Sequence, residues 1–203
     1  MHPLNQCCTL LRKIYGCVDE NDNRIHEERD KLQKLLRERK NTFVDELESI
    51  EEKINSLKAV SERAMAQKTS EEIGRIKKRL EEAQDEMNQI NEREELIGWT
   101  MTEFPKLEES MRNIKPFDEL WSLVLKQKES MEALEKSYVS NIVPDNVEKE
   151  NKQMISLANK LQGYFSSKEG MQYPAEIAQF IVTILTNFRK EIPVIKVICT
   201  EGM

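Results

Sequence analysis

The sequence predicts an all-α protein, in which long, charged helices with heptad stripes are followed by a bundle of shorter helices. Three observations support this fold class. Of 203 residues only six are Gly and six are Pro, while 33% are charged. Apolar residues recur at alternating steps of three and four, which is the spacing of a coiled-coil seam. No segment shows the alternation that a strand would need.

The charge balance excludes several kinds of partner. The chain has 31 Lys and Arg against 37 Asp and Glu, a net charge of −6. Nucleic-acid binding rests on clustered cations, so we expect no nucleic-acid partner. No apolar run is long enough to cross a bilayer, and the N-terminus lacks the order of a secretory signal. We therefore expect an intracellular protein without a membrane partner.

Composition divides the chain into three parts. Residues 1–24 are expected to be a poorly ordered N-terminal segment. Residues 25–98 are densely charged and carry the heptad stripes, as in a helical hairpin or a coiled-coil tail. Residues 99–203 contain both Trp, five of the six Phe and five of the six Pro, so they are expected to form a packed helical region.

Two apolar stripes mark the middle part. The first consists of Phe43, Leu47, Ile50, Ile54, Leu57 and Ala64. The second consists of Ile73, Ile76, Leu80, Ala83, Met87, Ile90 and Ile97, with Glu94 in one slot. The register breaks between them, where Thr69 and Glu72 have the spacing of a capping box and predict a new helix start. Both an antiparallel hairpin and a single rod covered by another chain are compatible with this pattern.

The C-terminal part predicts three shorter helices. The first is expected to begin at Pro116, the second to follow a cap at Asp145 or Asn146 and run to Gly163, and the third to end near Pro193. Gly170 and Pro174 are expected to bound the loop between the last two. Two sets of side chains are predicted to hold these helices in register or to face a partner. They are Phe117, Leu120 and Trp121, and Phe180, Ile184 and Phe188.

The sequence offers no catalytic constellation. None of the glycines begins a phosphate-binding loop, and there is no nucleophile elbow or zinc-protease motif. The four cysteines, Cys7, Cys8, Cys17 and Cys199, form no C-x-x-C pair, and His2 and His26 do not complete a ligand set. We therefore predict no catalytic residue, no cofactor and no metal in this chain.

From residue 93 onward the chain resembles one protein family. Phe104-Pro105-Lys106-Leu107-Glu108 is followed by Ile114-Lys115-Pro116-Phe117-Asp118-Glu119-Leu120-Trp121, and later by the sequence from Phe188 to Met203. In this order the motifs resemble dynein heavy chains of the axonemal type, where the tail enters the linker. The Pro-aromatic-x-x-Leu-Trp step is the clearest signature. The sequence departs from the family at Leu134, where many members have Trp, and at Ser137-Tyr138, where Gly-Pro often stands.

The resemblance implies a function for the chain. A complete heavy chain is a microtubule-dependent ATPase that binds ATP and Mg, whereas this chain has neither an ATP site nor a microtubule site. We therefore expect a fragment, a truncated isoform or an incomplete gene model, acting as a non-catalytic mechanical segment between tail and linker. The implied partners are heavy, intermediate or light dynein chains, and the implied location is the cytoskeleton of the cytoplasm, in the axoneme of a cilium or flagellum. The alternative is a free-standing coiled-coil adaptor that dimerises through the two stripes.

Overall fold

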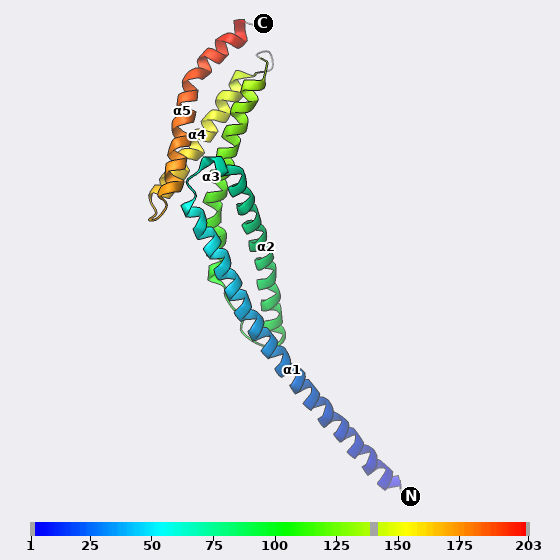
Figure 1. Cartoon of the computed structure of the whole chain (residues 1–203). Coiled ribbons are helices and arrows are strands. Elements are labelled where there is room, and N and C mark those ends of the chain that lie inside the picture. The colour runs from blue at the N-terminus through cyan, green and yellow to red at the C-terminus, as the bar shows by residue number, and fades with distance from the viewer. Residues whose placement is uncertain (1–2, 139–141, 202–203) are drawn as a thin grey trace. The chain divides into compact units, whose positions relative to one another are not determined.

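The structure, a computed structural model, describes residues 3–138 and 142–201, and within these ranges it contains helices and no strand. The α-helices are α1 (Pro3–Ser56), α2 (Ala66–Leu96), α3 (Pro105–Lys136), α4 (Pro144–Ser166) and α5 (Gln172–Glu201) (Figure 1). Two short 3-10 turns, η1 (Leu57–Ala59) and η2 (Arg63–Met65), lie between α1 and α2. The predicted all-α class is confirmed.

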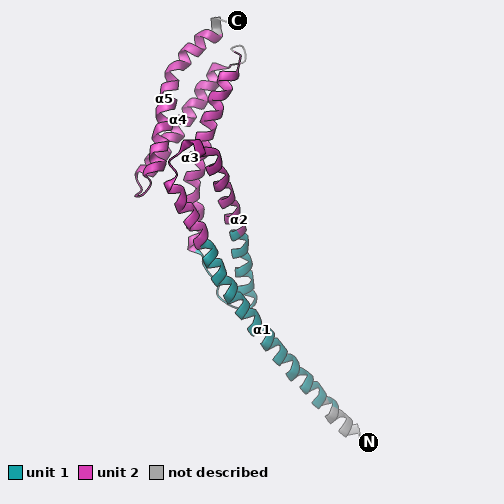
Figure 2. Cartoon of the chain, in the orientation of Figure 1, with its two compact units in different colours: residues 1–47, 83–104 teal, residues 48–82, 105–203 magenta. Residues whose placement is uncertain are grey.

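The chain forms two compact units, and each is described by itself (Figure 2). Unit 1 comprises residues 1–47 and 83–104, and unit 2 comprises residues 48–82 and 105–203. Helices α1 and α2 therefore contribute residues to both units. The units rest on contacts, whereas the division predicted at residues 24 and 98 rests on composition, so that division stays a prediction.

In unit 1, α1 packs antiparallel against α2. Leu36, Phe43 and Leu47 of α1 are buried, as are Ala83 and Ile90 of α2. The ring of Phe43 meets that of Phe104 edge-on, with centroids 4.9 Å apart. Burying these apolar side chains is the main favourable contribution to helix pairing, at roughly 1.5–3 kcal/mol for each large residue.

Helix α2 ends in unit 1 in a Schellman motif. The N–H of Gly98 donates to the carbonyl oxygen of Glu95 at 3.0 Å, and the N–H of Trp99 donates to that of Glu94 at 2.7 Å. The motif needs a left-handed residue at its turn, and Gly98 supplies it with φ at 74°. The chain thus leaves α2 sharply and returns toward α1.

In unit 2 the parts of α1 and α2 that carry the heptad stripes form a hairpin, and their stripe residues are buried. Residues 57–65 reverse the chain, after which Ile50, Ile54 and Leu57 are buried together with Ile73, Ile76 and Leu80. Two details of the prediction were wrong. Ala64 is exposed, because it lies in the turn and not on a continuing α1.

The second detail is the start of α2. The helix begins at Ala66, directly after η2, and Thr69 is a buried residue in its first turns. The predicted capping box of Thr69 and Glu72 therefore does not mark the helix start. The chain enters α2 from the 3-10 turn η2. The N–H of Met65 in this turn already donates to the carbonyl oxygen of Glu62 at 3.1 Å, before α2 begins.

Helix α3 is the central element of unit 2. Its Asp118 accepts a hydrogen bond from Lys77 of α2 at 2.7 Å, while the next residue, Glu119, pairs with Lys160 of α4 at 3.5 Å. Helices α4 and α5 pack closely against each other along an antiparallel hairpin, and Gly170 provides the left-handed turn residue with φ at 75°.

The prolines of unit 2 do not lie where the sequence predicts. Pro116 lies inside α3 and Pro193 inside α5, so neither begins or ends its helix. A proline within a helix removes one backbone hydrogen bond, which costs free energy. The burial of Phe117 and Ile192, beside the two prolines, offsets this cost, so both helices continue.

Helices α4 and α5 also differ from the prediction at their ends. Val143 is the N-cap of α4, without a side-chain cap bond, and Pro144 begins the helix, so Asp145 lies in its first turn and does not cap it. Gly163 lies inside α4, which continues to Ser166, and Pro174 lies in the first turn of α5.

Two glycine substitutions should have opposite effects on stability. Gly98→Ala should destabilise the protein by roughly 1–3 kcal/mol, since a side chain at positive φ is strained. Gly74→Ala, within α2 and with open space at its Cβ, should stabilise it by roughly 0.5–1 kcal/mol. Urea unfolding followed by circular dichroism measures both, and equal shifts of the two variants would contradict the assigned end of α2.

Candidate functional site

The predicted set in α3 lies at the centre of unit 2. Phe117, Leu120 and Trp121 are all buried, and Leu123 and Val124 are buried beside them, so more than one side of the helix is covered. The ring of Phe117 lies against that of Phe165 of α4, with centroids 5.4 Å apart. The Pro-aromatic-x-x-Leu-Trp step therefore supplies the side chains around which the helices of unit 2 gather.

Trp121 is the largest of these buried side chains, and its burial has a polar cost. Its indole Nε1 has no hydrogen-bond partner among the described residues. Leaving a buried donor unpaired costs roughly 1–3 kcal/mol, which the burial of the ring must offset. The residue is thus held by packing and not by a polar bond.

The predicted set in α5 is divided by the structure. Phe188 is buried, Ile184 is half-buried, and Phe180 is 36% exposed, with the guanidinium carbon of Arg63 at 3.3 Å from its ring centroid. The buried stripe of α5 is Ile177, Ile181, Leu185, Phe188 and Ile192. Phe180 directly precedes Ile181 and therefore lies about 100° around the helix from that residue, off the buried stripe. Whether either set faces a partner stays a prediction.

The coiled-coil stripe is mostly buried within the single chain. Its buried members are Phe43 and Leu47 in unit 1, and Ile50, Ile54, Leu57, Ile73, Ile76 and Leu80 in unit 2, with Ile90 again in unit 1. Met87 of unit 1 is half-buried. A second chain is therefore not needed to cover the stripe.

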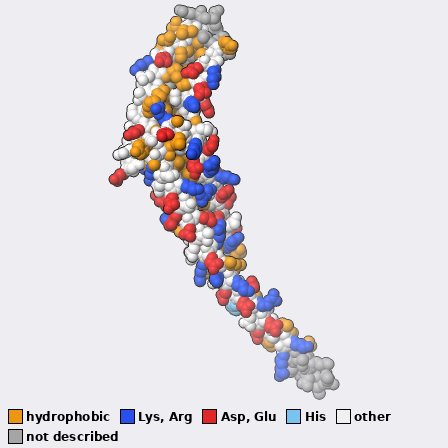
Figure 3. All heavy atoms as spheres, viewed as in Figure 1, with side chains coloured by type: hydrophobic (Ala, Val, Ile, Leu, Met, Phe, Trp, Pro, Cys, Tyr) orange, Lys and Arg blue, Asp and Glu red, His pale blue; other side chains and the backbone are white. Residues whose placement is uncertain are grey.

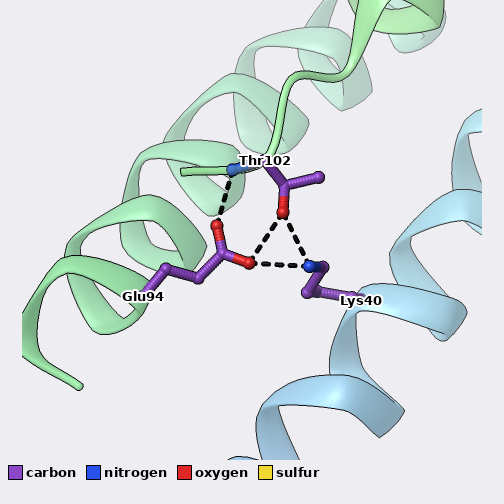
Figure 4. A network of polar contacts seen from close by, with 3 residues as sticks. All are labelled: Lys40, Glu94 and Thr102. Atoms are coloured by element: carbon purple, nitrogen blue, oxygen red, sulfur yellow. Dashed lines mark hydrogen bonds and ion pairs between the residues drawn. The ribbon is translucent and has the colours of Figure 1, made fainter. Parts of the chain in front are cut away.

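A buried polar cluster in unit 1 joins three segments of the chain (Figure 4). The Glu94 side chain on α2 is 1% exposed, and its Oε1 pairs with Lys40 Nζ of α1 at 2.7 Å. The Thr102 hydroxyl donates to the same Oε1 at 2.7 Å, and the Thr102 N–H donates to Oε2 at 2.6 Å. Lys40 Nζ also donates to the Thr102 hydroxyl at 2.6 Å. One carboxylate thus binds α1 and the segment after α2.

The electrostatics of the cluster favour an ionised Glu94. Burial alone would raise the pKa of this carboxyl group, but hydrogen bonds from Lys40 and from the hydroxyl and N–H of Thr102 outweigh it, so the pKa lies below its ordinary value. Around the cluster, Arg39 pairs with Glu86, and the guanidinium of Arg29 donates to the carbonyl oxygen of Ile97 at 3.2 Å. The cluster therefore holds a buried, ionised carboxylate whose charge is paired by Lys40.

Sequence reasoning noted Glu94 as a gap in the second stripe but did not find its partner. The signal was present, because Lys40 lies three residues before Phe43 and so occupies a heptad position of the first stripe. Opposite charges in the core positions of two antiparallel stripes predict a buried pair. Thr102 gave no such signal, since its position depends on the turn at Gly98.

A second charged cluster lies in unit 2, on the surface. Lys196 of α5 contacts Asp145 at 2.9 Å and Glu148 at 2.8 Å, and Glu148 also pairs with Lys152 at 2.5 Å. The hydrogen bonds from Lys152 and Lys196 lower the pKa of Glu148 to about 2. These groups fasten the C-terminal part of α5 to the start of α4, though exposed pairs contribute little stability.

The described part of the chain contains no candidate metal cluster. Among its residues there is no group of three His, Cys, Asp or Glu side chains that could hold a metal ion. The side chains of His2, Cys7 and Cys8 lie outside the described residues. Of the helices described, none is both long and apolar enough for a bilayer.

Comparisons with known proteins point to one family. Dynein axonemal heavy chain 1 of Mus musculus is 25% identical over 191 residues, which cover 94% of this chain. Dynein axonemal heavy chain 12 of Homo sapiens is 28% identical over 119 residues, or 59% of this chain. The chain is similar to axonemal dynein heavy chains over most of its length. No family model matches it, and no solved structure matches it significantly.

The similarity to axonemal dynein heavy chains extends beyond the resemblance described above. The motifs of residues 93–203 span at most 111 positions, and the 191 matched residues therefore also include much of the heptad-bearing part. The matched part is about 4% of each of these two relatives. The residues of this dynein-related segment are thus compared with only a small part of a far longer protein.

Truncating the central tryptophan should destabilise unit 2 strongly. Trp121→Ala should lower the free energy of unfolding by about 3–5 kcal/mol, because it leaves a cavity in a fully buried site. Urea unfolding followed by circular dichroism measures the change, with the exposed neighbour Ser122→Ala as a control. A loss below about 1 kcal/mol would contradict the central position of Trp121.

The buried Glu94 should make stability depend on pH. Its pKa is lower in the folded than in the unfolded chain, so its contribution is present above about pH 4.5 and is lost as the pH falls further. Between pH 6 and pH 4 the wild-type protein should therefore lose more stability than Glu94→Gln does. The control is the exposed Glu95→Gln, and the measurement is urea unfolding at each pH.

The same cluster predicts a non-additive pair of substitutions. Glu94→Leu alone leaves the Lys40 ammonium without its carboxylate and should cost roughly 3 kcal/mol, whereas adding Lys40→Met should recover part of that loss. Additive losses in a double-mutant cycle would show that the two side chains are not coupled.

Proposed function

We propose that the chain is a non-catalytic structural and mechanical segment of an axonemal-type dynein heavy chain, connecting tail to linker. The observation that carries the proposal is the match of 94% of the chain to such a heavy chain, over a structure made of packed helices. A segment of this kind transmits force when its helices stay in register under load. The proposal assigns ATP hydrolysis and microtubule binding to other parts of the heavy chain.

The packing of each unit supports a mechanical role. In unit 1 the Glu94 carboxylate ties α1, α2 and the residues up to Thr102 together, so these segments cannot slide without breaking buried charged hydrogen bonds. In unit 2, α3 contacts α2 through the pair of Lys77 and Asp118, and α4 through Phe117 and Phe165. Interiors packed in this way have low compressibility and transmit strain.

The proposed partners are other dynein chains, heavy, intermediate or light. Within unit 1, α1 presents an apolar stripe that no described residue buries, made of Leu10, Ile14, Val18, Ile25, Leu32 and Leu35, each at least 47% exposed. Charged side chains of both signs are interspersed along α1 around it (Figure 3). Such a stripe on a charged helix fits the apolar face of another helix, and we place this contact in the axoneme of a cilium or flagellum.

The structure does not favour the alternative of a coiled-coil adaptor. That alternative requires dimerisation through the stripes around Leu47 and Ile76, which are buried within the single chain. Pairing with a second copy through those stripes would require the hairpin to open.

The proposal is tested in a chimera. The matched residues of dynein axonemal heavy chain 1 of Mus musculus are replaced by this chain, and the purified heavy chain is assayed for ATP hydrolysis and for microtubule gliding. The chimera should do both. Ile54→Asn combined with Ile76→Asn breaks the hairpin, and it should slow gliding severalfold while basal ATP hydrolysis persists, because force is no longer transmitted.

The exposed neighbours Glu52→Asn and Lys78→Asn, made together, serve as the control and should leave gliding unchanged. A chimera that assembles and glides equally fast with a broken hairpin would overturn the mechanical role. A chimera that hydrolyses ATP but never glides, even with the intact hairpin, would show that this chain cannot functionally replace the matched residues of that heavy chain.

A further inference from the structure

Unit 2 contains a partly open cavity of about 280 Å³ that the mechanical role does not require. It lies among α3, α4 and α5. Its apolar wall includes Met131, Leu134, Met154, Leu185 and Phe188. A dry cavity of about 150 Å³ with apolar walls is already large enough for benzene, so this one has room for a two-ring aromatic group.

One polar group of the cavity lining is only half satisfied. Asn151 of α4 is 1% exposed, and its Nδ2 donates to the carbonyl oxygen of Leu185 at 3.2 Å. That bond fixes the orientation of the amide, because a carbonyl oxygen accepts from the NH₂ side only. The Oδ1 of Asn151 has no hydrogen-bond partner among the described residues. A buried acceptor without a donor costs free energy that a ligand could recover.

The rest of the lining determines the charge of the ligand. Among the described residues no Lys or Arg lines the cavity, and Glu150 is the only acidic side chain in the lining. Phosphates and carboxylates would therefore meet no cation and one negative charge. Uncharged groups are favoured, with hydroxyl and amide side chains such as Ser130 and Gln127 among the remaining polar lining residues.

We propose that this cavity binds an indole ring, with the ring N–H donating to Asn151 Oδ1 and the ring faces against Met131, Leu134 and Phe188. An indole has the apolar body that the wall accepts, two fused rings and a single donor. Asn151 Oδ1 is screened from solvent by the surrounding side chains. The ring N–H therefore reaches this atom after a small rotation of the lining side chains. The ring comes from a tryptophan side chain of a partner protein or from a free indole compound.

The test is an NMR titration of the isotope-labelled 203-residue chain with three probes: indole, 1-methylindole and N-acetyltryptophanamide. Indole should shift the side-chain amide signal of Asn151, and 1-methylindole, which lacks the donor, should bind about tenfold more weakly. If N-acetyltryptophanamide binds as well as indole, the natural source is a tryptophan side chain. If only indole binds, it is a free small molecule.

Two variants separate the cavity from the rest of the surface. Leu134→Trp fills the cavity with an indole of its own and should abolish binding, and a circular dichroism melt checks that it folds. Leu35→Trp makes the same change at an exposed position of α1 and should leave binding intact. Absence of indole binding to the wild-type chain, or equal binding of indole and 1-methylindole, would overturn the proposal.

Discussion

The interaction on which unit 1 depends is the bonding of the Glu94 carboxylate. A buried carboxylate is tolerated only when its oxygens are paired, and here both are. The backbone carbonyl of the same residue accepts the Schellman bond from Trp99. Glu94 therefore fixes the end of α2, the segment that follows it, and the position of α1 through Lys40. The apolar residues supply most of the stability, while a shifted register would leave the buried carboxylate without its donors.

In unit 2 the equivalent constraint is apolar. Helix α3 is joined to α2 by the pair of Lys77 and Asp118, and to α4 by Phe117 against Phe165 and by the pair of Lys160 and Glu119. Because Trp121 makes no polar bond among the described residues, its position is set by shape alone. The clearest family signature in the sequence thus coincides with the packing centre. This coincidence gives the relation to dynein heavy chains a physical meaning, since a substitution there would disturb several helices at once.

Much of this fold could be predicted from periodicity. Spacing alone assigns Phe43, Leu47 and Ile54 to an apolar stripe, and they are buried. The predictions were wrong where tertiary packing overrode a local signal for a helix end. Pro116 and Pro193 were expected at helix ends, yet burial of their neighbours carries both helices through. The choice between hairpin and rod depended on whether residues 57–65 turn, and a break in register is compatible with either.

The polar groups of the two interiors were the hardest features to predict, because their meaning depends on what faces them. Glu94 and Asn151 both occupy buried positions on amphipathic helices, where an apolar residue is the usual occupant. In the folded chain, however, Glu94 has its donors from Lys40 and Thr102, whereas Asn151 uses only its NH₂ side. A fully paired buried group specifies a fold, while a half-paired group beside a cavity retains the capacity to bind. The chain therefore uses the same kind of position for two purposes, and only the geometry of the neighbours separates them.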